Sequence, residues 1–443
     1  MDTDDSGVSL LLGSGRNFSG FTKKCAKIRY MLQCVTAGES HGQALVAIMS
    51  GLPAGVEVST AEVAAALKQR RCGYGRGARQ SFEADEVTIL SGMRHGKSLG
   101  SPVALTIANS EWPKWTAVMN PDVPDPQSLL VNPGKGDAHE AARNERLTTP
   151  RPGHADFAGM MKYGHDDARN VLERSSARET AARVALGVFA EALLAQAANI
   201  HLVSHVIALG EVSVPIDSPA PVFTDTNYLN ADPMRCFDVK ASARMVDAVD
   251  AAKKSGDTLG GVVQVIAYGV PVGLGSYATH ETRLDARLAA AVMSIQAVKG
   301  VEIGQAFLQA SLPGSQAHDA LYPESPQHPG DMGIKRLTNL AGGIEGGISN
   351  GSPVVVNAAV KPISTVPNAL PTIDLDTGLS ATGLHQRSDT TAVVPAAVIA
   401  QSEVATVLAS ALLEKTGGDS VTEVKRNLDN YVAEVSQRLS FDV

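Results

Sequence analysis

The stretch from Arg151 to Gly187 gathers side chains that could hold an anion at the start of a helix. Ser176 and Glu179 have the spacing of a capping box, and the apolar residues after them recur at helical spacing. A helix start presents unpaired backbone N–H groups and the positive end of the dipole, which suits phosphate. Basic and hydroxyl side chains crowd the same point: Arg174, Ser175, Ser176 and Arg178. An ordinary capped helix with surface arginines would show the same pattern.

Two histidines lie in glycine-bounded loops, where they could transfer protons. His154 is in a Pro/Gly loop upstream of the predicted anion site, and His41 follows Ser40 in the turn Gly38–Gly42 between two predicted strands. Histidine titrates near physiological pH, and glycine lets the backbone approach a ligand closely. A polar hairpin turn is the alternative for His41. Such a turn seldom needs histidine, so a functional role is favoured.

Arginines cluster in the loop that follows a second predicted helix. Ser59 and Glu62 form another capping box, and this helix is expected over residues 60–71. Four arginines then fall within ten residues: Arg70, Arg71, Arg76 and Arg79. Guanidinium groups bind carboxylate and phosphate, so we expect the loop to bind an anion. Its glycines imitate a dinucleotide fingerprint, but they follow a helix rather than a strand, and we reject that interpretation.

Further candidates lie in the second half of the chain. The run Lys361–Thr365 follows a predicted strand and combines lysine, proline and two hydroxyls, which could grip a phosphate. Asp389 precedes a helix with Pro395 near its start, and the residues alone favour a helix cap. His201 and His205 alternate in a strand without a visible third ligand, so we expect structural roles rather than metal binding.

Composition excludes several classes of function. The 443 residues carry a net charge of −8, which disfavours nucleic acid and anionic membranes as general partners. The four cysteines have neither C-x-x-C nor zinc-ligand spacing, which predicts reduced thiols and no metal site. The acidic N-terminus is unlike a signal peptide, and no uncharged apolar run is long enough to span a bilayer. These features predict a cytoplasmic protein.

The predicted organisation is one large domain after a short extension. Residues 1–30 are polar and Gly/Ser-rich, so we expect a disordered extension before a single domain over residues 31–443. Strands and helices alternate through that domain, with one amphipathic helix expected over residues 284–298. A Pro-rich excursion over residues 109–150 contains both tryptophans, and a loop this long predicts a lid or an interface.

From Met31 onward the chain resembles the chorismate synthase family, and the match spans nearly all of residues 31–430. Separated motifs carry the match: Gly38–Gly42, Arg151–Asp156, Arg174–Thr180 and Gln386–Asp389, with Arg70–Arg79 and Lys361–Thr365 in agreement. The resemblance implies a β-α-β sandwich of the α+β class, with helices between two antiparallel sheets, assembled as a homotetramer. It also implies that 5-enolpyruvylshikimate 3-phosphate is converted to chorismate and phosphate by anti 1,4-elimination, the last step of the shikimate pathway. That reaction needs reduced FMN although it involves no net redox change.

The resemblance also implies a role for each site residue. His41 would protonate the departing phosphate, His154 would act as an acid towards the reduced flavin, and Asp389 would accept a proton from flavin N5. This role overrules the cap interpretation of Asp389. The expected flavin contacts are Arg174, Ser175, Ser176, Gln296, Ala297, Gly346, Lys361, Pro362, Ile363, Ser364, Thr365 and Arg387. The expected contacts with the anionic groups of the substrate are Ser40, Arg70, Arg76 and Arg178.

A non-catalytic anion- or nucleotide-binding protein is the alternative. The arginine loops and the capped helix would suit it, but it would not need two histidines and a carboxylate around its anion site. The lyase is therefore favoured. No credible dinucleotide site is present, so we expect a separate flavin reductase to supply reduced FMN, without intrinsic use of NAD(P)H.

Overall fold

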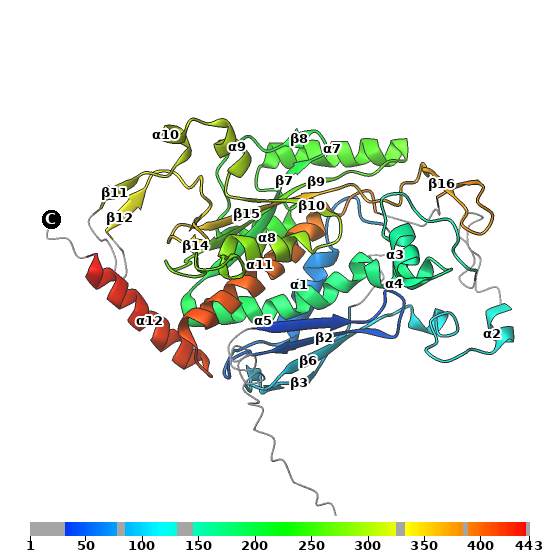
Figure 1. Ribbon diagram of the computed structural model, residues 1–443, viewed down its shortest axis with the longest axis horizontal. Coiled ribbons are helices and arrows are strands. Elements are labelled where there is room, and N and C mark those ends of the chain that lie inside the picture. The colour runs from blue at the N-terminus through cyan, green and yellow to red at the C-terminus, as the bar shows by residue number, and fades with distance from the viewer. Residues whose placement is uncertain (1–31, 78–84, 131–144, 325–332, 384–388, 440–443) are drawn as a thin grey trace, which may run out of the picture.

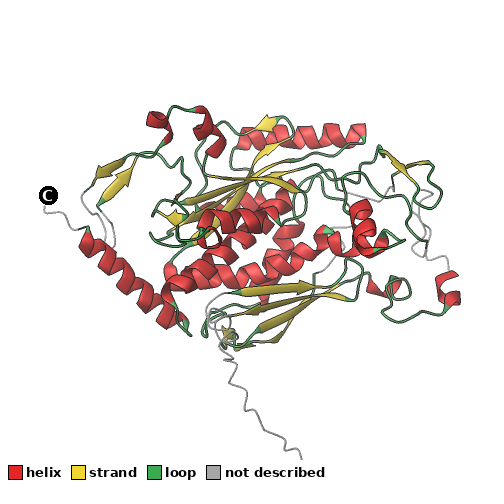
Figure 2. Ribbon diagram, viewed as in Figure 1, coloured by secondary structure: helices red, strands yellow, loops and turns green. Residues whose placement is uncertain are grey.

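Two antiparallel sheets enclose a layer of helices in this protein (Figures 1 and 2). The computed structural model describes residues 32–77, 85–130, 145–324, 333–383 and 389–439. The arrangement confirms the predicted α+β sandwich with helices between antiparallel sheets. The expected extension, residues 1–30, lies outside the described residues and stays a prediction.

The first sheet has the strand order β1-β2-β6-β3 and lies below the helical layer in Figure 1. Its strands are β1 (Gln33–Ala37), β2 (Ala44–Ser50), β6 (Val103–Ala108) and β3 (Val87–Ser91). Buried residues alternate with less buried ones along β2 and β6, as in a sheet with one face on the core. The loop that carries His41 joins β1 to β2, so the pairing of these two strands fixes the position of that loop.

The second sheet has the order β10-β15-β9-β7-β8 and is covered on both faces. Its strands are β10 (Val298–Ile303), β15 (Val354–Val360), β9 (Gly261–Tyr268), β7 (His201–Leu209) and β8 (Val212–Ser213). The helical layer covers one face, while α6 (Thr226–Ala231) and α7 (Val239–Ser255) lie on the other (Figure 1). Coverage of both faces explains why β7 and β9 are buried along most of their length.

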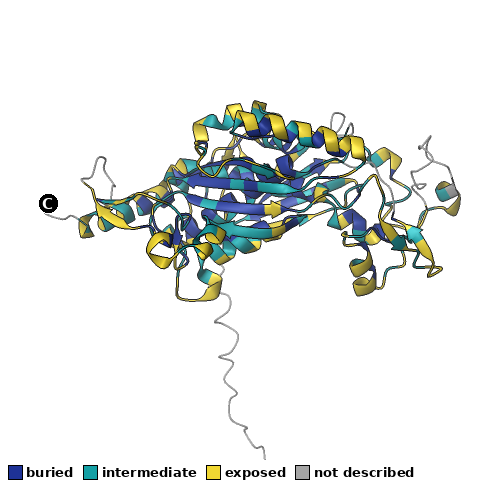
Figure 3. Cartoon of the chain, turned by 90° about the horizontal axis from the view of Figure 1, so that it is seen from above, coloured by how far each residue is buried: buried dark blue, intermediate teal, exposed yellow. Residues whose placement is uncertain are grey.

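The middle layer contains α1 (Thr60–Arg71), α5 (Thr180–Ala198), α8 (Leu284–Met293) and α11 (Val393–Thr416). Figure 3 shows the buried residues concentrated in the middle of the molecule. Helices α5 and α11 pack closely because Gly187 has no side chain; an added Cβ would lie 2.3 Å from Cβ of Ser402. The predicted bounds of α1 and its capping box at Ser59 and Glu62 are confirmed.

Two helical segments meet the length and composition of a membrane span, but each contains charged residues, so the expectation that no uncharged apolar run could span a bilayer stands. They are Arg169–Ala198 and α11. Both are mostly buried among other elements, 61% and 78% of the tested windows respectively, and helices of a protein core meet the same criterion.

Shorter elements surround the sandwich. The helices are α2 (Pro126–Leu130), α3 (Asp156–Tyr163), α4 (Arg169–Ser175), α9 (Ala306–Ser311), α10 (Gly314–Ala317) and α12 (Val421–Arg438). The hairpins pair β4 (Met93–Arg94) with β5 (Lys97–Ser98), β11 (Leu321–Pro323) with β12 (Ile334–Arg336), β13 (Ile344–Glu345) with β14 (Ile348–Ser349), and β16 (Pro371–Ile373) with β17 (Ser380–Thr382). Single 3-10 turns occur at η2 (Trp112–Lys114), η3 (Ala177–Glu179), η4 (Phe223–Asp225) and η5 (His280–Thr282).

Two predictions of helix bounds are wrong. The helix expected over 284–298 ends at Met293, because Ala297 takes a left-handed φ of 69° and Val298 begins β10. The capping box of Ser176 and Glu179 is not formed. Ser176 instead begins η3 by accepting a hydrogen bond from the Arg178 N–H, and α5 begins at Thr180.

Candidate active site

His41 is held by a carboxylate that the sequence reasoning missed. Its Nδ1 lies 2.9 and 3.0 Å from the two carboxylate oxygens of Glu173 on α4, and its backbone N–H donates to the same carboxylate at 2.8 Å. The Glu173 side chain is only 2% exposed. The His41 ring stacks on Trp115 with 4.0 Å between the ring centroids. The guanidinium group of Arg169 lies over the Trp115 ring, 5.4 Å from its centroid. The position and orientation of the imidazole are therefore fixed from several sides.

His154 is held in a similar way by Asp156, at the start of α3. Nδ1 of His154 lies 2.5 Å from the carboxylate, which also accepts from Nε of Arg151 at 2.8 Å. Burial alone would raise the pKa of Asp156, but the hydrogen bonds from His154 and Arg151 and the charge of Arg151 hold it well below its usual range. Asp156 is therefore ionised and can stabilise a positive charge on His154.

The run Lys361–Thr365 lies against the His154 loop, as its predicted role requires. Nζ of Lys361 donates to the carbonyl of Gly153, and Nη1 of Arg151 donates to Oγ1 of Thr365 at 3.1 Å. Burial and the charge of Lys299 lower the pKa of Lys361. Within the run, the carbonyl of Ile363 accepts from Thr258 at 2.9 Å, Pro362 packs over Gly260, and Cβ of Ser364 lies beside Gly153.

Three of the arginines converge on one buried carboxylate, Asp85. Arg70 and Arg71 lie 3.6 and 3.2 Å from it, and Arg178 also pairs with it. Asp85 is 7% exposed. Its single negative charge offsets only part of the positive charge of the three arginines. The excess positive charge suits an anion. Asp85 was not predicted, because nothing in its sequence neighbourhood distinguishes it from other acidic residues.

Asp389 does not cap helix α11. The residue before that helix is Ala392, which makes no side-chain cap. Asp389 instead accepts from the Gly77 N–H and pairs with Nη1 of Arg76, both at 2.6 Å. The cap interpretation from the residues alone is therefore wrong, and Asp389 belongs to the arginine loop. Arg387, Arg79 and the other residues of 384–388 and 78–84 lie outside the described residues.

One predicted flavin contact, Gln296, bonds to another buried carboxylate, Glu179. It accepts from Thr36 at 2.7 Å, from Gln296 at 3.1 Å and from Arg183 at 2.9 Å. Burial opposes ionisation of Glu179, but these hydrogen bonds and the charge of Arg183 lower its pKa. Glu179 was predicted as a capping residue, whereas it positions a predicted ligand contact.

Individual contacts place the other predicted residues. Ser40 Oγ accepts from Ser176 Oγ at 3.3 Å, and Ser175 Oγ lies 3.5 Å from the Leu172 carbonyl. Arg174 donates to the carbonyls of Gly38 and Thr36, so it closes the His41 loop onto α4. Gly346, another of the predicted residues, has a φ of 60°, and the space where a side chain would lie is open.

Hydrogen bonds and ion pairs, joined by short stretches of backbone, link these groups into one ring of contacts. From the His41 loop the ring passes through Ser176, Glu179 and Gln296 to Ala297, whose carbonyl accepts from the Lys361 N–H at 2.9 Å. It continues from Ile363 through Thr258 to the backbone of Leu259, which donates to Thr390. Asp389, Arg76, Arg70, Asp85 and Arg178 complete it. Most of the predicted groups among the described residues are thus linked by contacts, whereas no contact joins Gly346 to them.

His201 and His205 each bond to a neighbouring amide side chain. His205 is buried and bonded to Gln264, and burial lowers its pKa to about 4. His201 bonds to Asn199 and stacks on Phe223. Among the described residues no group of three His, Cys, Asp or Glu side chains is placed to hold a metal ion.

Comparison with known proteins adds independent information. A family model described as chorismate synthase matches residues 32–413. The chain is 56% identical over 408 residues to the chorismate synthase of Mycolicibacterium vanbaalenii, covering 92% of this chain and 97% of that relative. It is 58% identical over 402 residues to that of Thermobifida fusca, covering 91% and 98%. A crystal structure of chorismate synthase aligns with a TM-score of 0.70 at 34% identity, covering 92% of this chain and 99% of that one.

Proposed function

The chain belongs to the chorismate synthase family and is a lyase of aromatic amino-acid biosynthesis, and from that premise we propose that it converts 5-enolpyruvylshikimate 3-phosphate to chorismate and phosphate with reduced FMN as its cofactor. One observation carries the proposal. Two histidines, each bonded to a buried carboxylate, lie in the same ring of contacts as an arginine cluster. A protein that only binds an anion would need the arginines but not the histidines.

The arginine cluster suits the charges of this substrate, which carries one phosphate and two carboxylates. Arg70 and Arg178 share Asp85, so their charges are only partly neutralised and remain able to attract an anion. Expulsion of phosphate places negative charge on the leaving oxygen, and an acid that protonates it lowers the barrier. His41 has Nδ1 on Glu173, so its Nε2 is the atom that would deliver this proton. Glu173 holds the imidazole in the orientation that this step requires.

The residues present fit a flavin. Oε1 of Gln296 is buried and has no hydrogen-bond partner among the described residues, although the amide N of the same side chain bonds Glu179. Gly346 leaves open space, and Ala297 holds a strained left-handed backbone. Gln296, Ala297, Gly346 and Lys361–Thr365 would hold the cofactor. Reduced FMN supplies electron density, for breaking the C–O bond, that no side chain can supply.

His154 and Asp389 are proposed to move protons at the cofactor site. Asp156 and Arg151 both contact Nδ1 of His154, at 2.5 and 3.0 Å, and fix the orientation of the imidazole that would act as the acid. Asp389 has its carboxylate between Arg76 and the Gly77 N–H, and these two contacts fix the position from which it would accept a proton.

The decisive test is turnover under anaerobic conditions with pre-reduced FMN. Many equivalents of substrate should be converted without a stoichiometric reductant, and oxidised FMN should give no product. Turnover with oxidised flavin, or consumption of one reduced flavin per product, would refute the mechanism. Turnover with NADPH and oxidised FMN without added reductase would leave the mechanism intact but would contradict the proposed separate reductase.

The remaining parts of the proposal concern assembly and location. We expect a homotetramer with twofold axes and a cytoplasmic location, with a separate reductase as the source of reduced FMN. Light scattering that finds a monomer across micromolar concentrations would contradict the assembly.

A further inference from the structure

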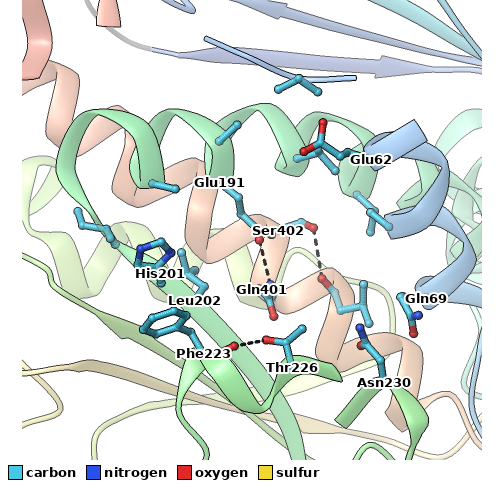
Figure 4. Close-up of a pocket in the computed structure, with 18 of the residues that line it drawn as sticks. Glu62, Gln69, Glu191, His201, Leu202, Phe223, Thr226, Asn230, Gln401 and Ser402 are labelled. Atoms are coloured by element: carbon cyan, nitrogen blue, oxygen red, sulfur yellow. Dashed lines mark hydrogen bonds between the residues drawn. The ribbon is translucent and has the colours of Figure 1, made fainter. Parts of the chain in front are cut away.

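A cavity of about 410 Å³ lies between helices α1, α5 and α11 and strand β7, apart from the groups described above. In Figure 4, Glu191 extends from α5 toward Gln401 of α11, while His201 and Phe223 lie at the other side. The volume is within the range of small-molecule sites, roughly 300 to 1,000 Å³. None of the predicted active-site residues lines it.

Two opposite charges face this cavity without pairing. Arg235 is 5% exposed, and it donates only to neutral groups: the carbonyl of Ser204 at 2.9 Å and the side chain of Asn230. Glu191 accepts from the amide of Gln401 at 3.0 Å. Each charge lies near enough to act on the other, yet among the described residues neither forms an ion pair within 4.0 Å. Arg235 is buried and Glu191 is half-buried. Charges withdrawn from water are normally paired with an opposite charge, and neither of these charges has such a partner among the described residues.

The backbone at Arg235 is strained to hold the side chain in place. Its φ is 52°, in the left-handed region that non-glycine residues rarely occupy. Its own carbonyl accepts from the Val206 N–H at 2.9 Å, which fixes the residue against β7. Strain of this kind often occurs where a side chain must meet a ligand.

The rest of the lining is mostly apolar. It includes Val184 and Val188 of α5, Ile200, Leu202 and Val398. A ligand that pairs with both Glu191 and Arg235 and contacts this apolar wall needs a cationic group, an anionic group and an apolar part. We propose that this cavity binds a small zwitterion of the α-amino-acid class, with its ammonium on Glu191, its carboxylate on Arg235 and its apolar side chain against the aliphatic wall.

Titration calorimetry on the full-length protein tests the proposal. The probes are L-leucine and L-phenylalanine, with isoamylamine and isocaproate as analogues of leucine that lack one charged group each. At least one amino acid should bind, and each analogue should bind much more weakly. Glu191→Gln keeps the shape and the contact with Gln401, so it should fold normally but weaken binding by about thirtyfold or more. Glu211→Gln, which changes an exposed carboxylate outside the cavity lining, is the matched control and should leave the affinity unchanged.

Arg235→Lys and Arg235→Gln test the proposed contact between Arg235 and the carboxylate of the ligand. If the guanidinium pairs with the carboxylate, Arg235→Gln should abolish binding of L-leucine but affect isoamylamine little, and Arg235→Lys should retain part of the affinity. Circular dichroism would confirm that both variants are folded. Equal affinity of Glu191→Gln and wild type, or equal affinity of leucine and isoamylamine, would overturn the proposal. No heat from any probe at millimolar concentration would also overturn it, and would leave a cavity that holds water only.

Discussion

The substitution Glu191→Gln should stabilise the folded protein at alkaline pH but not at acidic pH. Burial raises the pKa of Glu191 from an ordinary 4.5 to about 7, although the hydrogen bond from Gln401 and the charge of Arg235 act in the opposite direction. The unfolded chain therefore loses this proton near pH 4.5 and the folded chain near pH 7. Between those values the folded state binds more protons, so stability falls as the pH rises and stays low above pH 7.

The size of the effect follows from the same values. Each pH unit between the folded and unfolded pKa is worth about 1.4 kcal/mol, so the charge on Glu191 costs the folded state about 3 kcal/mol above pH 7. The neutral glutamine avoids this cost while keeping the contact with Gln401. For a chain of 443 residues, we expect Tm to rise by about 3 °C at pH 8 and to change little at pH 5.

The assay is thermal unfolding of both proteins at the two pH values, with urea unfolding as a second measurement. Glu211→Gln changes an exposed carboxylate between β7 and β8 and serves as the control for a lost surface charge. An equal gain at both pH values would show that packing, not the charge, is responsible. A loss of stability at pH 8 would show that Glu191 has a compensating cation, and the reasoning would be refuted.

Four further outcomes are expected. Asp389→Asn should bind FMN and substrate but nearly abolish turnover; normal turnover would remove Asp389 from catalysis. Glu173→Gln leaves only one acceptor oxygen for the two N–H groups of His41, so kcat should fall by on the order of a hundredfold with little change in KM, and an unchanged kcat would disprove the positioning role. Gly187→Ala places a methyl group against α11 and should lower the free energy of unfolding by about 2 kcal/mol in urea titrations, whereas wild-type stability would mean that the helices separate easily. A chain beginning at Met31 should keep its activity and Tm, and a large loss of either would make the extension part of the fold.

The sandwich architecture was expected from the family resemblance, whereas the residue patterns themselves predicted individual strands and helices. The capping box at Ser59 and the glycine after α11 mark helix ends through local contacts, and local contacts can be read from neighbouring residues. Glu179 shows where prediction from local spacing fails. Its spacing from Ser176 suggests a cap, but Thr36, Arg183 and Gln296 offer it better partners from distant parts of the chain.

In the candidate site, too, some residues could be recognised from the sequence and others only from the structure. His41, His154 and the arginines were recognisable by type and by their glycine-rich surroundings. Glu173 and Asp85, which hold them, are ordinary acidic residues in sequence, and only the folded chain brings each within bonding distance. The unpaired charges of the α1–α5–α11 cavity were likewise invisible, because an unpaired charge is defined by what surrounds it in space.

The ring of contacts around the candidate site has a consequence for synthesis on the ribosome. Its members are far apart in the chain: His41 and Glu173 are separated by 132 positions, Gly153 and Lys361 by 208, and Gly77 and Asp389 by 312. Contacts of such high sequence separation form slowly, since a long loop must close before any stabilisation is gained. The arginine loop therefore leaves the ribosome early, but its contacts with Asp389 can form only after most of the chain has been synthesised. A chain that ends before Asp389 lacks a member of the ring, so premature termination yields a protein without a complete site.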